Sequence, residues 1–292
     1  MVFSNAPPLV SVICIFYNAE QFLREAIDSV LAQSCSNYEL ILVDDGSSDG
    51  STDIARQYSR DYRHVFYADH PGHENLGMSA ARSRGLAEAR GEFVACIDAD
   101  DVWRPEKLAR QIAILEQSPR VGMVCGTVNY WSSWNGGQDE LIPTGHLVDE
   151  VSLPPDTSLA LYPLGEAAAP CPSDAMLRRR VIDAVGGPEQ HFTGMYEDQC
   201  LYAKVYLETP VYFASEVWLD YRQHADSCVS TSTLGGLYAP AARYWMDWFS
   251  GYLAARHFEG KADVERALRR ARWRLDHPRL RRVVKLLRRA AR

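Results

Sequence analysis

The sequence predicts an α/β fold, with a doubly wound, mostly parallel sheet flanked by helices and a helical C-terminal extension. Short apolar runs alternate with helix-like segments through the N-terminal half, as strands and crossover helices do in such sheets. The runs lack polar alternation, which is typical of strands buried on both faces. Acidic residues follow two of these runs. Because ligands collect beyond the carboxyl ends of the strands in this architecture, a ligand site is expected there.

The first predicted strand covers residues 9–16, and Tyr17 and Asn18 end it. Asn18 is expected to cap the helix that follows, with Gln21 three positions later as in a capping box. One apolar face of that helix is predicted from the spacing of Phe22, Ala26, Ile27, Val30 and Leu31.

The second predicted strand covers residues 39–43 and ends at Asp44 and Asp45. An Asp-Asp-Gly-Ser sequence also suits a tight turn, so this alternative stays open at the level of the residues. A helix over about residues 78–89 is predicted to lead into the central strand, which begins at Phe93.

Three carboxylates follow the central strand within four positions: Asp98, Asp100 and Asp101. Like charges this close repel unless water or a cation separates them. Mg²⁺ or Mn²⁺ would take one or two of the carboxylates and keep positions for water and phosphate oxygens. The alternative is a solvated acidic turn before a helix that starts near Pro105. Because Tyr17 and Asp45 also end predicted strands, a metal site is the favoured interpretation.

Composition indicates a reduced intracellular protein. The chain has 292 residues, and its 47% of hydrophobic residues is ample for a core. The 7 cysteines are scattered without a CxxC pair, which favours buried thiols over a disulfide framework or a zinc site. We see no signal peptide in residues 1–8 and no apolar run long enough to cross a bilayer. The expected localisation is cytoplasmic, with peripheral contact on the inner face of the membrane as an additional hypothesis.

Charge is distributed unevenly along the chain. Residues 261–292 contain 13 Lys and Arg against 3 Asp and Glu, a balance of +10, while the remaining residues sum to −17. His277 and Pro278 are expected to break a helix that runs from Val264. The basic amphipathic segment after this break could lie on an anionic membrane, dock on an acidic partner or fold back on the acidic body. The membrane surface is the favoured alternative, and no nucleic acid is expected.

A further helix is predicted over residues 239–257. Its aromatic residues at i, i+3, i+4 and i+7 share one face: Trp245, Trp248, Phe249 and Tyr252. Core packing is the favoured role of this face, and contact with a partner or lipid is the alternative.

Four motifs in sequence order resemble those of the family 2 glycosyltransferases, inverting enzymes with the GT-A fold. They are residues 10–18 (VSVICIFYN), 43–49 (VDDGSSD), 75–82 (NLGMSAAR) and 97–101 (IDADD). The resemblance resumes at residues 175–187, 197–198 and 221–224, and it is absent from residues 131–165 and after 233. Together the motifs are far more specific than any one of them. The segment 131–165 lies where such enzymes vary on the acceptor side.

The resemblance implies a donor site. Asp100 would ligate the metal, Mn²⁺ or Mg²⁺, that bridges the donor diphosphate, Asp98 would contact the ribose, and His224 would complete the metal site. Asp45 would accept a hydrogen bond from the base, most often uracil. Phe16, Tyr17 and Arg82 would also lie against the nucleotide sugar. By their residue types alone, His224 could be structural and Arg82 a surface salt-bridge partner.

The resemblance also implies a catalytic base, Asp198, preceded by Glu197. A base on the acceptor side permits one displacement that inverts the anomeric configuration. Without the resemblance, this acidic pair would suit dipole compensation in the first turn of a helix. Two further residues have open alternatives: Asp101 is expected to cap the helix near Pro105, and Trp103 to border the sugar or belong to the core.

The predicted organisation is a GT-A-like catalytic domain over residues 8–230 and a helical extension over 231–292. The predicted function is transfer of one sugar from a nucleotide-diphosphate sugar, UDP-linked by default, to a saccharide or lipid-linked saccharide acceptor in cell-surface polysaccharide or glycoconjugate synthesis. The alternatives are a nucleotidylyltransferase and a non-catalytic nucleotide-binding or receiver-like module. The absence of a Gly-rich basic loop after residue 16 counts against the first, and Asp198 with the Asp-X-Asp motif against the second.

Overall fold

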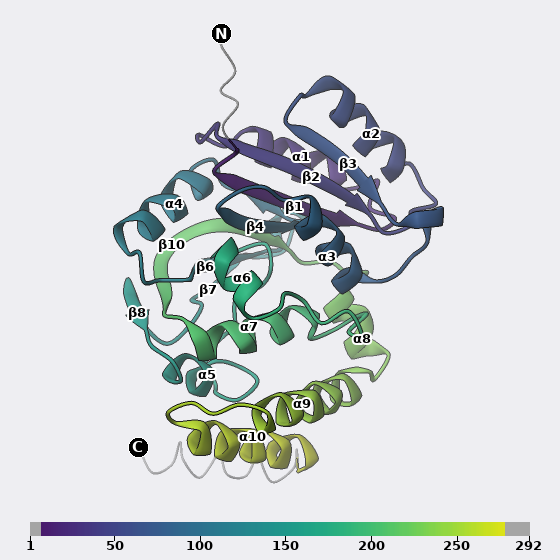
Figure 1. The fold of residues 1–292 in the computed structure, drawn as a ribbon. Helices are drawn as coiled ribbons and strands as arrows, with labels where there is room; N and C mark the ends of the chain where they lie inside the picture. Colours follow the sequence, from purple (N-terminus) through teal and green to yellow (C-terminus); the bar gives the residue numbers. More distant parts are fainter. Residues whose placement is uncertain (1–6, 278–292) are drawn as a thin grey trace.

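The computed structural model describes residues 7–277. Its strands form a ten-stranded sheet in the order β3-β2-β1-β4-β9-β6-β10-β5, with β7 paired to β6 and β8 paired to β10 (Figure 1). The strands are β1 Val10–Phe16, β2 Tyr38–Asp44, β3 Val65–Asp69, β4 Phe93–Asp98, β5 Val102–Trp103, β6 Met123–Trp131, β7 Glu140–Ile142, β8 Glu150–Ser152, β9 Met176–Arg178 and β10 Val211–Arg222.

The long strands pair in parallel, whereas each antiparallel pairing involves one of the short strands β5, β7, β8 and β9. The helices that connect and flank them are α1 Leu23–Leu31, α2 Ser51–Asp61, α3 Met78–Glu88, α4 Lys107–Gln117, α5 Asp156–Ala160, α6 Arg179–Ala184, α7 Glu197–Glu208, α8 Cys228–Leu234, α9 Tyr238–Ala254 and α10 Lys261–Asp276. The predicted α/β fold with helices on both faces is confirmed.

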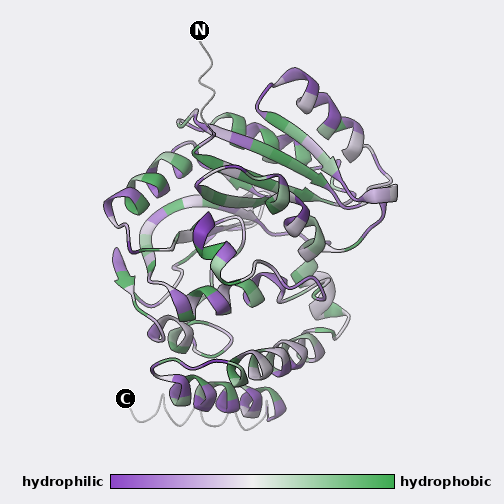
Figure 2. Ribbon diagram, in the orientation of Figure 1, coloured by the Kyte–Doolittle hydropathy of each residue, from purple (hydrophilic) through white to green (hydrophobic). Residues whose placement is uncertain are grey.

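The buried strands divide the core into two layers. Every residue of β1 and β2 is buried, and alternate side chains of β1 enter opposite layers, with Val12 and Cys14 on one side and Ile13 and Ile15 on the other. Helices α1, α2 and α4 cover the first layer, and α3, α6 and α7 cover the second. Figure 2 shows the corresponding hydrophobic colour along the central strands. This double burial explains why the strand sequences lack polar alternation.

A third apolar cluster joins α7 to α9 and α10 (Figure 1). Trp245 and Phe249 of α9 are buried and stack with ring centroids 4.9 Å apart, and Trp248 and Tyr252 pack at the edge of the cluster. The predicted core role of this aromatic face is therefore confirmed. Between residues 7 and 277, no helix is both long and apolar enough to span a membrane.

The C-terminal helix α10 ends at Asp276, one residue before the predicted break at His277 and Pro278. The basic amphipathic segment that follows lies outside the described residues. The division of the chain at residue 230 stays a prediction.

Two predicted helix caps are wrong. Helix α1 begins at Leu23 without a side-chain cap, and Asn18 instead accepts a 2.8 Å hydrogen bond from the amide of Ser48, because the loops after β1 and β2 lie side by side. Helix α4 also lacks a side-chain cap. Strand β5 separates α4 from Asp101, and the buried Asp101 carboxylate accepts from the Arg222 amide at 3.1 Å.

Candidate active site

Parallel pairing brings the predicted donor residues to one edge of the sheet. In the register of β1, Ile15 lies opposite Asp98, and Phe16 lies opposite Asp44, so the loops after β1, β2 and β4 meet. They line a cavity of about 690 Å³, which we call the donor cavity. Its lining includes every predicted donor residue except Arg82, namely Phe16, Tyr17, Asp45, Asp98, Asp100 and His224.

Asp45 is held at this cavity by main-chain donors. The amides of Leu76 and Gly77 both donate to its carboxylate at 2.9 Å, and His70 Nε2 lies 3.2 Å from Oδ1. The next residue, Gly46, has φ +82°, and a Cβ there would lie 2.6 Å from the Asn75 amide nitrogen. A glycine is therefore required where the two loops cross.

Asp44 faces away from the cavity and has a structural role. One of its oxygens accepts from the Ser47 amide at 2.8 Å and the other from the Thr52 hydroxyl at 2.5 Å. The turn interpretation of Asp-Asp-Gly-Ser thus holds for Asp44, whereas the buried Asp45 lines the donor cavity. His70, which belongs to none of the sequence motifs, is buried beside Asp45.

Asp100 and His224 meet across the sheet. Their Oδ2 and Nε2 atoms lie 2.9 Å apart, because β10 pairs with β5 directly after the acidic loop. The carboxylate oxygen suits Mn²⁺ or Mg²⁺, whereas an imidazole nitrogen at the same cavity wall suits a transition metal and so favours Mn²⁺ of the two. Residues 7–277 contain no group of three or more His, Cys, Asp or Glu side chains placed to hold a metal by themselves. The site fits a cation whose remaining ligands come from water and phosphate oxygens.

Arg222 positions the acidic loop. Its Nε donates to the Asp100 carbonyl at 2.7 Å, and its Nη2 donates to Glu25 at 2.5 Å. The guanidinium lies over the rings of Phe22, Trp131 and Trp134 at 4.4–4.9 Å from their centroids. Nothing in the local sequence distinguishes Arg222 from an exposed arginine, so this anchor follows from the tertiary structure alone.

Two other predicted residues do not line the donor cavity. Trp103 is buried and donates from Nε1 to the Ser173 carbonyl at 2.7 Å, so its role is in the core. Arg82 is 5% exposed, which rules out a surface salt bridge. It lies behind Asp98, and it lines a second cavity of about 390 Å³, which we call the acceptor-side cavity.

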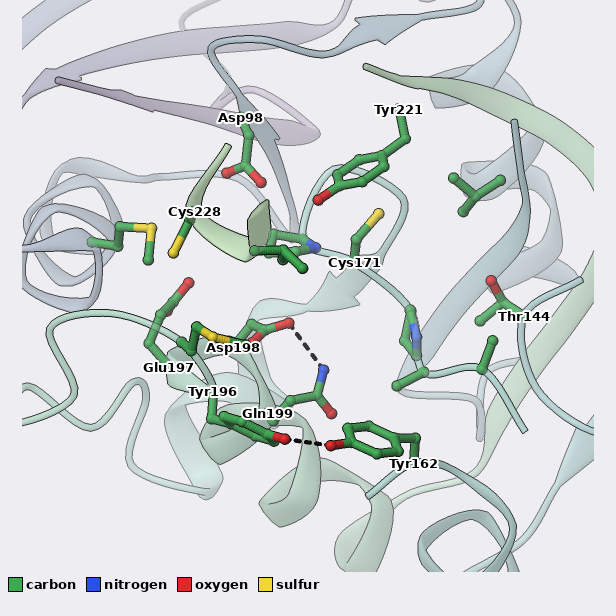
Figure 3. A pocket seen from close by; sticks show the side chains of 18 of the residues that line it. Asp98, Thr144, Tyr162, Cys171, Tyr196, Glu197, Asp198, Gln199, Tyr221 and Cys228 are labelled. Carbon is green, nitrogen blue, oxygen red and sulfur yellow. Dashed lines mark hydrogen bonds between the residues drawn. The ribbon is translucent and has the colours of Figure 1, made fainter. Parts of the chain in front are cut away.

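The acidic pair at the start of α7 also faces the acceptor-side cavity (Figure 3). Arg82 links it to the donor side, because Nε donates to Glu197 at 2.9 Å and Nη2 donates to Asp98 at 2.8 Å. Burial raises the pKa of Glu197 to about 7, against the opposing charge of Arg82. The pair is therefore more than compensation for the dipole of α7.

Asp198 combines cavity access with a raised proton affinity. Gln199 Nε2 donates to its Oδ2 at 2.9 Å, as Figure 3 shows, and burial raises the pKa of the carboxyl. A partly buried carboxylate of this kind can accept a proton from a hydroxyl in the cavity. The two cavities share Asp98 in their lining, together with Met78, Tyr221 and Cys228.

The remaining wall of the acceptor-side cavity consists of residues that the sequence motifs do not predict. It contains Tyr130, Tyr162, Tyr196 and Tyr238, and the segment 131–165 contributes Ile142, Thr144 and Tyr162. These residues come from β6, β7, α9 and connecting loops, with Tyr196 directly before α7, and they carry no motif. Only the variable position of 131–165 pointed toward this part of the site.

Comparisons with known proteins identify the family and the fold. The putative teichuronic acid biosynthesis glycosyltransferase TuaG of Bacillus subtilis is 43% identical over 114 residues, which are 38% of this chain and 44% of that protein. The chain thus matches less than half the length of this curated relative. S. aureus TarS in complex with UDP-GlcNAc superposes with a TM-score of 0.68 at 18% identity, over 92% of this chain and 73% of that one.

The mannosyltransferase PcManGT from Pyrobaculum calidifontis, in complex with GDP-Man and Mn²⁺, gives a TM-score of 0.61 at 18% identity, over 93% of this chain and 70% of that one. These likenesses confirm the GT-A-like fold expected from the motifs. The family model described as glycosyl transferase family 2 matches residues 11–186, from β1 through the acidic loop to α6. On that match, the chain belongs to glycosyl transferase family 2.

Proposed function

We propose that the protein transfers one sugar from a nucleoside-diphosphate sugar, UDP-linked by default, to an acceptor hydroxyl with inversion. The observation that carries the proposal is the junction of the two cavities at Asp98. One cavity is lined by Asp45, Asp100 and His224 and the other by Asp198. A sugar at the junction would have its leaving group on one side and a proton acceptor on the other.

On the donor side, we assign Asp45 to the base and Asp98 to the ribose, with Phe16, Tyr17 and Arg82 around the nucleotide sugar. Arg82 acts there through Asp98, to which it donates. Asp100 and His224 would hold Mn²⁺ or Mg²⁺. The cation, when bound, offsets the negative charge that develops on the leaving diphosphate. PcManGT and GalNAc-T7, both similar in fold, were solved with Mn²⁺.

On the acceptor side, we assign Asp198 as the general base. Its carboxylate would take the proton of the attacking hydroxyl while the oxygen bonds to the anomeric carbon from the face opposite the diphosphate. A single displacement of this kind inverts the configuration. Glu197 would hold Arg82 and thereby the donor-side Asp98.

A donor screen tests this function. The protein is incubated with UDP-, GDP- and other nucleotide sugars and an acceptor panel in Mn²⁺, and products are detected by mass spectrometry. We expect nucleotide release and a glycosylated product, whose anomeric configuration NMR shows to be inverted. A retained configuration would contradict the mechanism. Transfer of a nucleotidyl group, or donor binding without turnover, would instead favour one of the two alternative classes.

The cellular setting is part of the proposal. We propose a saccharide or lipid-linked saccharide acceptor in cell-surface polysaccharide synthesis. The relative TuaG supports this setting, because its description names teichuronic acid biosynthesis. The acidic catalytic unit over 8–230 would carry out transfer, with 231–292 as the extension. The extension would also contribute to the site, because Tyr238 of α9 lines the acceptor-side cavity.

We further propose peripheral contact with anionic membrane through the basic C-terminal part, on the cytoplasmic face. Helix α10 contributes the half-exposed Trp273 to this part of the chain. Co-sedimentation with anionic liposomes, with and without residues 278–292, tests the contact. Binding that the deletion leaves unchanged, or that is absent at low salt, would favour the fold-back alternative.

A further inference from the structure

The acceptor-side cavity carries negative charge. Among the described residues that line it, the charged side chains are Arg82, Asp98, Glu197 and Asp198. Arg82 donates to both Glu197 and Asp98, so its positive charge is engaged by the cavity's own carboxylates. With Asp98 and Asp198 ionised, these side chains sum to −2 when Glu197 is also ionised and to −1 when it is protonated, its pKa being about 7. An entering carboxylate or phosphate would meet like charge and would also lose hydration.

In the described part of the chain, a neighbouring cavity does not supply free positive charge that would offset these carboxylates. It has a volume of about 150 Å³ and shares Tyr162 and Tyr238 with the acceptor-side cavity. Its arginine, Arg274, donates to the Glu166 carboxylate and to the Leu164 carbonyl. The arginine that lines this neighbouring cavity is therefore also paired with an acid.

The uncharged part of the lining is rich in tyrosine. We call its five tyrosines the tyrosine wall: Tyr130, Tyr162, Tyr196, Tyr221 and Tyr238. The Tyr162 hydroxyl contacts those of Tyr196 and Tyr238, and the rings of Tyr130 and Tyr221 pack with centroids 5.4 Å apart. A tyrosine offers an apolar ring face and one polar tip. A pyranose ring likewise presents C–H groups on its faces and hydroxyls around its edge, so the wall matches an uncharged sugar.

We propose that this cavity binds the acceptor as an uncharged saccharide and selects against an accepting residue that bears a carboxylate or phosphate. The inference rests on the proposed function and specifies its acceptor class. The tyrosine wall supplies stacking and hydroxyl contacts, Asp198 takes the hydroxyl proton, and the three carboxylates supply the discrimination.

Paired ligands test the selectivity directly. Methyl hexopyranosides of three configurations are compared with the matching hexuronides and 6-phosphates by ligand-observed NMR, using protein saturated with the nucleotide of its best donor. We expect at least one neutral glycoside to bind at least tenfold more tightly than its anionic partners. Equal or tighter binding of the anionic partners, or no binding by every neutral glycoside, would overturn the inference.

A charge insertion tests the physical cause. Val229 on α8 lines the cavity and is 51% exposed, so Val229→Lys adds a cation with little risk to folding. Leu234 is on the same helix, is 84% exposed and lies outside the lining of both cavities, which makes Leu234→Lys the matched control. We expect Val229→Lys to reduce the neutral preference at least fivefold, in a salt-dependent manner, and Leu234→Lys to leave it unchanged. Equal effects of the two variants would show that charge in the cavity does not set the selectivity.

The tyrosine wall has its own variant pair. Tyr162→Phe removes the central hydroxyl of the tyrosine cluster and keeps the ring, while Tyr62→Phe makes the same change at an exposed position outside the cavity. We expect Tyr162→Phe to raise the acceptor KM severalfold with the nucleotide Kd unchanged, and Tyr62→Phe to alter neither constant. An unchanged acceptor KM in Tyr162→Phe would contradict the assigned wall.

The experiments separate failure of this inference from failure of the proposed function. If no donor releases its nucleotide, the proposed function itself is overturned. If a donor turns over but anionic acceptors are preferred, only this inference is overturned.

Discussion

At the scale of single residues, Arg82 connects the two halves of the site. It is buried between Glu197 and Asp98, at 2.9 and 2.8 Å, and its Nη1 has no hydrogen-bond partner among the described residues. Glu197 is buried and Asp98 is partly buried, so the guanidinium offsets carboxylate charge that water reaches only in part. Removing one member of such a group leaves the others uncompensated.

We therefore expect Arg82→Ala to lower the free energy of unfolding by about 3–5 kcal/mol, the usual cost of breaking a buried ion pair. Chemical denaturation followed by circular dichroism measures it. Arg110→Ala is the control, because Arg110 pairs with Glu216 on the surface and both side chains are exposed. Similar losses in the two variants would contradict the role of burial.

Replacing Asp198 tests its assignment as the general base. Asp198→Asn keeps the size of the side chain but cannot accept a proton, so kcat should fall by about 10² to 10⁴-fold. The nucleotide Kd, measured by calorimetry, should change little, because Asp198 lines the acceptor-side and not the donor cavity. A variant that keeps most of its turnover would require a different base.

The pH dependence follows from the same burial. Burial raises the pKa of Asp198, and a base is active only when deprotonated, so activity is lost as pH falls through that pKa. We expect kcat/KM to decline on the acid side at a pH above about 3.9, the ordinary aspartate value. Glu197, with a pKa of about 7, titrates nearby. The acid limb should persist in Glu197→Gln, and its disappearance there would assign it to Glu197 instead.

At the scale of elements, α7 holds the acidic pair in place because its sides belong to two cores. Val205 and Tyr206 pack into the second layer of the sheet core, whereas Cys200 and Ala203 pack into the cluster with α9 and α10. The C-terminal helices thus support the site from behind. Their aromatic face packs in the same apolar cluster as α7, the helix that carries Asp198 in its first turn.

Phe249→Ala tests this support. Phe249 is fully buried and stacks on Trp245, so its loss should cost about 3–5 kcal/mol of unfolding free energy. Ser250→Ala, at the next and exposed position of α9, should change stability by less than about 0.5 kcal/mol. Thermal and urea denaturation of both variants provide the comparison. A small loss in Phe249→Ala would mean that α9 adds little to the core.

At the scale of the whole molecule, the site joins loops that are distant in sequence. The donor cavity is lined by residues from Ile15 to Thr231 and the acceptor-side cavity by residues from Met78 to Tyr238. Nucleotide and cation binding should therefore stabilise the fold as a unit, because they connect several loops at once.

We expect UDP at a hundred times its Kd to raise the free energy of unfolding by about 2.7 kcal/mol in the presence of Mn²⁺. Excess EDTA should weaken this effect and abolish turnover, and either Mn²⁺ or Mg²⁺ should restore both. Thermal-shift and activity measurements on one preparation provide the two readouts. Full activity in EDTA would refute the assignment of Asp100 and His224 to a metal.

By itself, the sequence determined the α/β architecture and predicted which edge of the sheet gathers the acidic residues. Unbroken apolar runs specify strands buried on both faces, and acids directly after β2 and β4 must meet where parallel strands end. Four motifs in order were enough to indicate the family. These features are local in the chain, so residue type and spacing encode them.

Only the tertiary structure decided which side chains meet across the sheet. Arg82 pairs with Glu197, a contact of 115 positions in sequence separation. Arg222 packs against three aromatic rings and donates to the Asp100 carbonyl of the acidic loop. The contact of His70 with Asp45 and the tyrosine wall of the acceptor-side cavity are likewise made by residues that are distant in sequence. No local propensity specifies them, because burial and pairing at these positions depend on how distant loops pack together.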